Sequence, residues 1–167
     1  TSVVKSFIAS EQIKKEGVLL LAPTGKARVR LGSMAHGVKS MTIAQFLTRC
    51  GCFDWTNMEA FVPYDIDNHK YAIEKNIIID ECSMLTCDDF YVLLNALDLA
   101  HVNRIILIGD QYQLPPIGCG RPFSDLCNYL KANNKEAITE LKTIVRTIVT
   151  GESDVLTLAS WYKGGDR

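Results

Sequence analysis

The stretch NIIIDECSML, residues 76–85, places a run of isoleucines directly before two carboxylates. A short apolar, β-branched run of this kind predicts a buried strand, and functional groups collect at the carboxyl ends of the strands in a parallel sheet. We therefore expect Asp80 and Glu81 at the edge of a sheet. At a nucleotide-hydrolysing site, the first of two such carboxylates can hold Mg²⁺, and the second can orient and deprotonate the attacking water. The alternative is a pair that only joins a strand to the next helix, and the dipeptide alone leaves both interpretations open.

Apolar runs alternate with amphipathic segments along the rest of the chain. Besides residues 76–80, buried strands are predicted over residues 18–22 and 104–109, and the second of these is apolar on both faces, as in a central strand. Helices are predicted over residues 2–15, 27–34, 42–49, 86–99, 122–131 and 153–163. This alternation predicts an α/β domain with a largely parallel sheet. Residues 51–75 are polar and mixed, and they give no clear assignment.

A second polar segment follows the predicted strand at residues 104–109. Gln111 and Gln113 come after Gly109 and Asp110, in a loop that Pro115 and its neighbouring proline stiffen. A glutamine at a strand tip can hydrogen-bond a phosphate oxygen or a water molecule. The alternative is a stiff surface turn, but such a turn does not need two glutamines before two prolines.

Composition limits the class of protein. The chain has 167 residues, enough for one domain with a real core, and its formal net charge of −1 gives no global basic field. It has neither an apolar run long enough to cross a membrane nor the layout of a signal peptide. Its six cysteines are expected to be the reduced thiols of a cytoplasmic protein. Their spacings do not favour a metal site. The chain begins at Thr1 without a methionine, so we expect a fragment.

The dipeptide Gly25-Lys26 lies in APTGKARVRL, residues 22–31, but it does not complete a P-loop. The pattern G-x-x-x-x-G-K-[ST] needs a glycine where Leu20 stands and a hydroxyl where Ala27 stands. Taken with the other polar segments, this stretch resembles motif Ia of superfamily 1 DNA helicases, specifically the RecD-like branch (the exodeoxyribonuclease V alpha-subunit type). The other motifs of that branch are resembled, in order, by TIAQFL (42–47, Ib), IIIDECSM (77–84, II), GDQYQLPPIG (109–118, III) and ELKTIVRT (140–147, IV).

The resemblance implies a RecA-like P-loop NTPase domain, with residues 1–167 forming part of the first motor domain and ATP with Mg²⁺ as cofactors. Asp80 would bind Mg²⁺, Glu81 would be the catalytic base, and Gln113 would sense the γ-phosphate. Arg146 would act as an arginine finger on the nucleotide, a role that contributes roughly 10³–10⁵ in rate in NTPases. Thr1 would be the last residue of a G-K-T motif, and its hydroxyl would bind Mg²⁺.

The resemblance also implies single-stranded DNA as the partner. Contacts with the DNA backbone are expected from Pro23, Thr24, Gly25, Lys26 and Thr42. Arg28 also suits a phosphate contact, whereas Arg30 is expected on a solvated helix face. Further recombination or repair subunits are expected as partners, and a membrane is not.

Several departures from the branch remain. Ala44 replaces a histidine common in motif Ib, and Thr147 replaces a glutamine after the motif IV arginine. The P-loop strand, expected beside the strand at residues 104–109, would precede Thr1, so we expect negligible ATPase activity from these 167 residues alone.

Two alternatives stay open. One is a helicase of the telomere- and replication-fork-associated branch, which shares IDExSM and GDxxQLPP. The other is a non-enzymatic DNA-binding or regulatory remnant of an ATPase.

Overall fold

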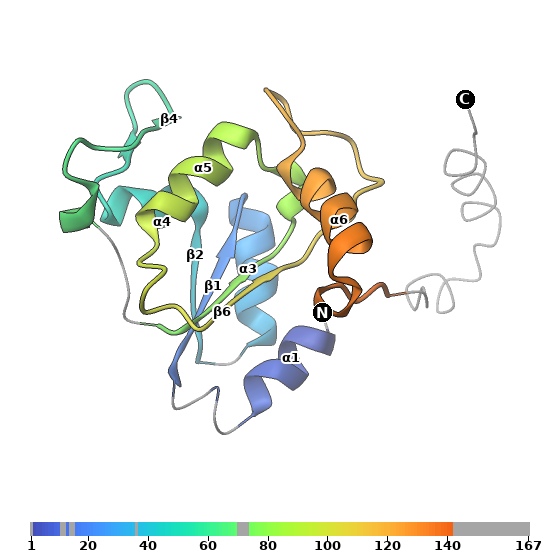
Figure 1. Cartoon of the computed structure of the whole chain (residues 1–167). Coiled ribbons are helices and arrows are strands. Elements are labelled where there is room, and N and C mark those ends of the chain that lie inside the picture. Colours follow the sequence, from blue (N-terminus) through green and yellow to red (C-terminus); the bar gives the residue numbers. More distant parts are fainter. Residues whose placement is uncertain (1, 11–12, 14–15, 36, 70–73, 142–167) are drawn as a thin grey trace. The chain divides into compact units, whose positions relative to one another are not determined.

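The computed structural model describes residues 2–10, 13, 16–35, 37–69 and 74–141 (Figure 1). The chain divides into two compact units, residues 1–126 and residues 127–167. The described elements are α1 (Ser2–Ala9), β1 (Val18–Ala22), α3 (Gly25–Met34), β2 (Lys39–Thr42), α4 (Ile43–Arg49), β3 (Phe53–Asp54), β4 (Glu59–Ala60), η1 (Ile66–His69), β5 (Asn76–Ile79), η2 (Cys82–Met84), α5 (Cys87–Ala96), β6 (Arg104–Leu107), α6 (Pro122–Asn133) and η3 (Lys135–Ala137). The described part of the second unit holds the end of α6 and η3.

The described residues of the first unit form a four-stranded sheet in the order β2-β1-β5-β6. All three strand pairs are parallel. The connections between these strands carry helices, as parallel pairing requires. The α/β class with a parallel sheet flanked by helices, predicted from the alternation of apolar runs and amphipathic segments, is therefore confirmed.

Alternate residues of the central strands enter two separate cores. Leu19 and Leu21 of β1 belong to a cluster that α4 and α5 cover, whereas Leu20 belongs to a cluster with residues of α1 and α3 (Figure 1). Successive side chains of a strand point to opposite faces, so an uninterrupted apolar run is what a strand covered on both sides requires. All five residues of β1 are buried.

Among the described helices, α3, α4 and α5 begin with a threonine cap. Thr24, Thr42 and Thr86 each accept a hydrogen bond from a backbone N–H in the first turn of α3, α4 and α5. At α4 and α5 the cap is reciprocal, because Gln45 and Asp89 accept a hydrogen bond from the backbone N–H of the capping threonine. The predicted helix at residues 42–49 is confirmed, and that predicted at 86–99 ends earlier, at Ala96.

The helix predicted over residues 2–15 is interrupted at Ser10, and Ile13 and Glu16 beyond the interruption are again helical. Helix α1 ends at Ala9, where the backbone N–H of Ser10 donates to the carbonyl oxygen of Phe7 at 3.2 Å. This bond to the third preceding residue tightens the chain and closes α1. The backbone N–H of Gly17, the predicted stop, donates to the carbonyl oxygen of Ile13 at 3.1 Å. The predicted helix at residues 153–163 lies outside the described residues.

In the described sheet the strand at residues 104–109 is not central, and its pairing with a strand that would precede Thr1 stays a prediction. Within the described residues β6 is an edge strand that pairs only with β5, and the side chains of Ile105 to Leu107 are only partly buried. Both faces of β6 still contact apolar cores, which accounts for the apolar run. Ile105 and Leu107 pack against one core cluster, and Ile106 packs against the other.

The segment that gave no assignment contains a small hairpin. Strands β3 and β4 pair in antiparallel fashion, with Phe53 opposite Ala60. Met58 adopts a left-handed backbone conformation in the turn (φ 58°). Two-residue strands of this kind lack the alternating pattern on which sequence interpretation depends.

Gly109 follows β6 at a point where three elements approach each other. A Cβ atom at this position would lie 2.9 Å from the ring of Phe123 on α6 and 3.1 Å from the backbone nitrogen of Ser83. Gly25, at the start of α3, has no such neighbour within 4 Å. The backbone after β6 can therefore lie against the loop after β5 only because residue 109 has no side chain.

We predict that Gly109→Ala lowers the free energy of unfolding by about 1–3 kcal/mol, because the added methyl group overpacks this contact. Gly25→Ala is the matched control, and it should leave stability unchanged or raise it by up to about 1 kcal/mol, since alanine favours the helix. Urea denaturation of both variants measures the difference. Equal stabilities would contradict the close approach at Gly109.

Candidate functional site

The strand register brings the polar segments to one edge of the sheet. Ala22 of β1 is the partner of Thr42 at the end of β2, and Leu21 is the partner of Ile79 in β5. Ile79 is in turn the partner of Leu107 in β6. Because the strands are parallel, the loops that follow all four leave the sheet on the same side. The segments singled out in the sequence therefore meet at this edge.

Asp80 and Glu81 leave the end of β5, as expected. Asp80 is 8% exposed, and its backbone N–H donates to the carbonyl oxygen of Leu21 at 2.9 Å. Glu81 adopts a left-handed conformation (φ 57°, ψ 38°), and its backbone N–H donates to Oδ1 of Asp80 at 3.0 Å. A non-glycine residue in this region carries backbone strain, which is found often at functional sites. The strand end thus holds the two carboxylates in a defined orientation.

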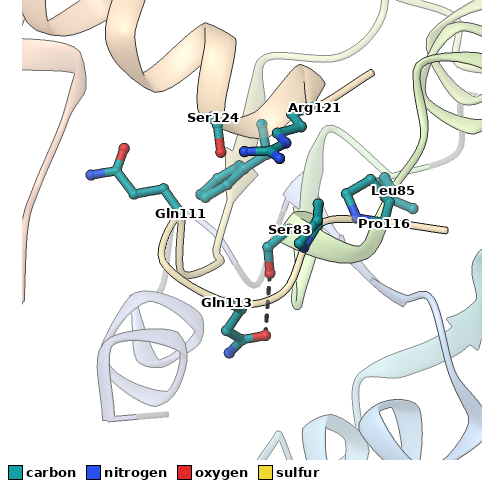
Figure 2. Close-up of a pocket in the computed structure, with 9 residues that line it drawn as sticks. Ser83, Leu85, Gln111, Gln113, Pro116, Arg121 and Ser124 are labelled. Atoms are coloured by element: carbon teal, nitrogen blue, oxygen red, sulfur yellow. Dashed lines mark hydrogen bonds between the residues drawn. The ribbon is translucent and has the colours of Figure 1, made fainter. Parts of the chain in front are cut away.

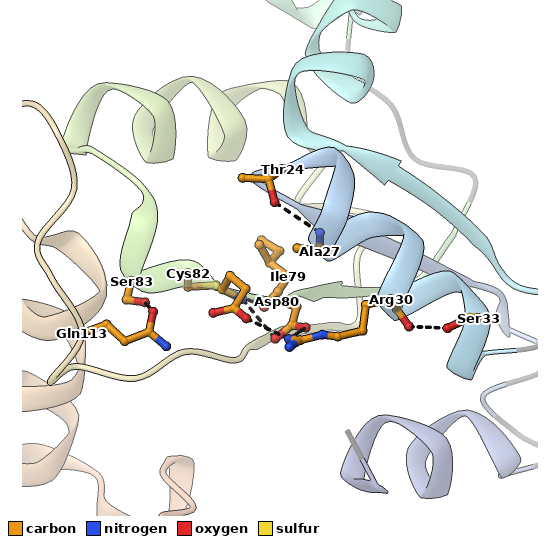
Figure 3. Close-up of polar contacts among 10 residues, drawn as sticks. Thr24, Ala27, Arg30, Ser33, Ile79, Asp80, Cys82, Ser83 and Gln113 are labelled. Carbon is orange, nitrogen blue, oxygen red and sulfur yellow. Dashed lines mark hydrogen bonds and ion pairs between the residues drawn. The ribbon is translucent and has the colours of Figure 1, made fainter. Parts of the chain in front are cut away.

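Arg30 is exposed, as expected of a solvated helix face, but it also contacts both carboxylates, which was not expected. Its Nη2 donates to Oε1 of Glu81 at 2.8 Å and to Oδ2 of Asp80 at 3.4 Å (Figure 3). Although burial acts to lower the pKa of the Arg30 guanidinium, the hydrogen bonds and charges of Asp80 and Glu81 hold it above its ordinary value. In the sequence, Lys26, Arg28 and Arg30 alternate with other residues of one segment, and nothing there singles out Arg30. Which of them faces β5 depends on how α3 packs on the sheet.

Gln113 lies beside the loop that follows the carboxylates. Oγ of Ser83 donates to Oε1 of Gln113 at 3.4 Å (Figures 2 and 3). The loop that carries Gln113 is tightened at Asp110, whose carbonyl oxygen accepts from the backbone N–H of Gln113 at 3.1 Å. The residues that line the small pocket here are Ser83, Leu85, Gln111, Gln113, Pro115, Pro116, Arg121, Phe123 and Ser124. The segments expected as motifs II and III are therefore in direct contact.

The residues expected to contact DNA lie at the starts of two neighbouring helices. Gly25 and Lys26 open α3 and are exposed, and the partly buried Pro23 precedes them. Thr24 and Thr42 are the caps of α3 and α4, and their side-chain oxygens accept from Ala27 N and Gln45 N, respectively. Each hydroxyl hydrogen stays available as a donor, because a hydroxyl both accepts and donates. Thr1 and Arg146 lie outside the described residues.

The donor set at β5 fits Mg²⁺. Within the described residues no group of three or more His, Cys, Asp or Glu side chains is placed to hold a metal ion. Mg²⁺ in nucleotide sites does not need such a group, because one or two carboxylates and the phosphates of the substrate suffice. Asp80 supplies a nearly buried carboxylate, which suits this role.

Two other features of the described residues concern the reactivity of a thiol and the length of the helices. Burial, together with the neighbouring Cys52, raises the pKa of the Cys50 thiol to about 12, so it stays protonated at neutral pH. None of the described helices is both long enough and apolar enough to cross a bilayer.

Comparison with known proteins gives relatives that are much longer than this chain. An uncharacterized protein of Methanocaldococcus jannaschii, MJ1519, is 29% identical over 153 residues, which cover 87% of this chain and 13% of that protein. DNA helicase B of Mus musculus is 30% identical over 132 residues, which cover 78% of this chain and 11% of the helicase.

Among solved structures, Pif1 helicase from Bacteroides in complex with ADP-AlF3 and ssDNA has a TM-score of 0.47 at 19% identity. The match covers 75% of this chain and 29% of that one. A protein-family profile described as AAA domain matches residues 1–166. Because that match spans almost all of the 167 residues, the chain belongs to the AAA domain family.

Proposed function

We propose that this chain is part of the first motor domain, with a RecA-like fold, of an ATP-driven DNA helicase of superfamily 1, in the RecD-like branch. The observation that carries the proposal is the meeting of four segments at one sheet edge: the two helix starts at Thr24 and Thr42, the carboxylates after β5 and the Gln113 loop after β6. The similarity to DNA helicase B supports the helicase class. Movement in the 5′ to 3′ direction on single-stranded DNA is proposed only because the chain resembles the RecD-like branch.

Each carboxylate has a separate part in ATP hydrolysis. Asp80 would hold Mg²⁺, which when bound neutralises the charge that develops on the phosphates. Glu81 would accept the proton of the attacking water, and its backbone conformation turns it away from the line of the strand. Gln113 would report the state of the nucleotide to the loop that begins at Ser83, through the hydrogen bond between these two residues. Thr1 would add a hydroxyl ligand to Mg²⁺, and Arg146 would act on the nucleotide as an arginine finger.

Single-stranded DNA would cross the starts of α3 and α4. The hydroxyls of Thr24 and Thr42, the exposed Gly25 and the Lys26 ammonium suit contacts with phosphates and sugars, which carry no sequence information. Binding through these groups would be sensitive to salt and indifferent to sequence, because it releases counterions and does not read base edges.

We predict that Glu81→Gln in the whole protein lowers kcat for ATP hydrolysis by about 10²–10⁴, the usual contribution of a general base. ATP binding should be retained, because the amide keeps the shape of the side chain. Glu136→Gln, at an exposed position, is the control and should match the wild type. DNA-stimulated hydrolysis at the wild-type rate in Glu81→Gln would exclude this residue as the base. A wild-type protein that binds DNA and does not hydrolyse ATP would favour the non-enzymatic alternative.

We predict that Arg30 is a positioning residue for Glu81. Arg30→Ala should lower kcat by roughly 10- to 100-fold, as a displaced catalytic group does. The KM for ATP should stay within about twofold, and Arg30→Lys should recover part of kcat. Because the Arg30 side chain is 43% exposed, the ion pair contributes only about 0–1 kcal/mol to stability.

Two measurements separate this role from a general loss of fold. Thermal unfolding should change little in the Arg30 variants, and Lys5→Ala, on an exposed face of α1, should leave both kinetics and stability unchanged. A fall in kcat that parallels a large loss of stability, with no recovery in Arg30→Lys, would count against a positioning role.

A further inference from the structure

An open groove lies beside the outer strand of the sheet, between α3, α4 and the β3–β4 hairpin. The residues that line it are Arg28, Ser40, Met41, Gln45, Thr48, Arg49 and Trp55. Two guanidinium groups, an indole and several neutral polar side chains thus surround one depression. Apart from Arg28, which suits a phosphate contact, none of these residues is among the DNA contacts expected from the sequence.

The indole of Trp55 is held in place while much of it stays exposed. Its Nε1 donates to Oγ1 of Thr48 at 2.9 Å, and the Thr48 hydroxyl donates to the carbonyl oxygen of Ala44 at 2.7 Å. The ring of Phe53 packs edge-on against the indole, with ring centroids 4.9 Å apart. Trp55 is still 54% exposed. A large aromatic surface that is fixed in advance loses little side-chain entropy when a ligand binds to it.

The two arginines of the groove have no carboxylate partner among the described residues. Arg49 is exposed at the end of α4, and Arg28 is partly buried in the first turn of α3. The nearby carboxylate of Asp54 is engaged by the turn of the hairpin, where the backbone N–H of Thr56 donates to Oδ1 at 2.8 Å and the Asn57 side chain donates to Oδ2 at 2.9 Å. Both guanidinium groups are therefore available for an anion.

We propose that this groove binds single-stranded DNA, with one base stacked on Trp55 and the flanking phosphates held by Arg28 and Arg49. A fixed aromatic face beside unpaired cations is the arrangement by which proteins bind single strands without reading sequence. A base in a duplex is already stacked on its neighbours, so the exposed indole favours a single strand. The proposal rests on the proposed function, and it extends the DNA contacts from the start of α4 to its end.

The groove adjoins the two helix starts at which DNA contacts are proposed. Gln45 lines the groove, and its Oε1 accepts from the backbone N–H of Thr42 at 3.0 Å. Arg28 lies in the same helix as Gly25 and Lys26, and its backbone N–H donates to the carbonyl oxygen of Thr24 at 2.9 Å. A strand that touches the two helix starts can therefore pass directly to Trp55.

The test measures binding of labelled oligo(dT) to the whole protein by fluorescence anisotropy at several salt concentrations. Trp55→Ala should weaken binding by roughly 5- to 150-fold, the range of one base stacked on an aromatic side chain. Trp55→Phe should keep most of the affinity. Arg28→Gln and Arg49→Gln should each reduce the slope of log K against log salt by about 0.7. For a duplex of matching length, Trp55→Ala should bind as tightly as the wild type does.

An optical readout locates the base independently of affinity. This chain has two tryptophans, Trp55 and Trp161, so Trp161→Phe leaves Trp55 as its single reporter. In the whole protein, with any tryptophan outside these 167 residues also changed to phenylalanine, oligo(dT) should quench the Trp55 emission. Tyr91→Ala, an exposed aromatic residue on α5, and Lys75→Gln, an exposed cation before β5, are the matched controls and should bind as the wild type does.

The outcomes separate this inference from the proposed function. If the wild type binds oligo(dT) while the Trp55 and arginine variants keep the same affinity and salt slope, the groove is not part of the DNA site and the proposed function stands. If the wild type does not bind oligo(dT), both are overturned. Quenching of Trp55 that saturates together with binding supports the groove even if Trp55→Ala fails to fold.

Discussion

The parallel pairing of β1 with β5 is the constraint on which the candidate site depends. Leu21 lies opposite Ile79, so the chain leaves both strands at the same level, and the backbone N–H of Asp80 still donates to the carbonyl oxygen of Leu21. A slip of one residue would turn every side chain of a strand to the other face of the sheet. Such a slip would shift Asp80 along the edge of the sheet, and it would move side chains of the slipped strand from one core to the other.

Helix α3 joins the two halves of the site in one rigid element. Its first residues, Gly25 and Lys26, lie where DNA contacts are proposed, and Arg30 in the same helix donates to Glu81. A helix moves as a unit over such a short span, so a displacement at its start also moves the guanidinium that holds the carboxylates. The contact between Ser83 and Gln113 links the β5 loop to the β6 loop in a similar way. The places proposed for DNA and for nucleotide are thus joined by one helix and one hydrogen bond between loops.

The parts of the fold that could be predicted are those with a strong local cause. The strands at β1 and β5 are uninterrupted apolar runs, and the threonine caps with Gln45 and Asp89 three residues later mark where α4 and α5 begin. The errors have a common cause as well. The interruption of the first predicted helix at Ser10 depends on a single tight turn, and β2, which was not predicted, forms through its pairing with β1. Neither property can be read from the periodicity of one segment.

The sequence by itself determined which residue types follow each strand, because carboxylates, glutamines and threonine caps occupy fixed positions relative to the apolar runs. Those positions suffice to predict that Asp80, Glu81, Gln113 and Thr24 share one edge of a parallel sheet, whereas Thr42 joins them through β2, a strand that was not predicted. Only the tertiary structure decided that Arg30 reaches the carboxylates and that Arg28 and Arg49 meet Trp55 in one groove. The physical reason is that a helix presents several basic side chains, and the direction each takes is decided by the rotation of the helix on the sheet. That rotation depends on the packing of the buried Ala27 and Leu31, not on the basic residues themselves.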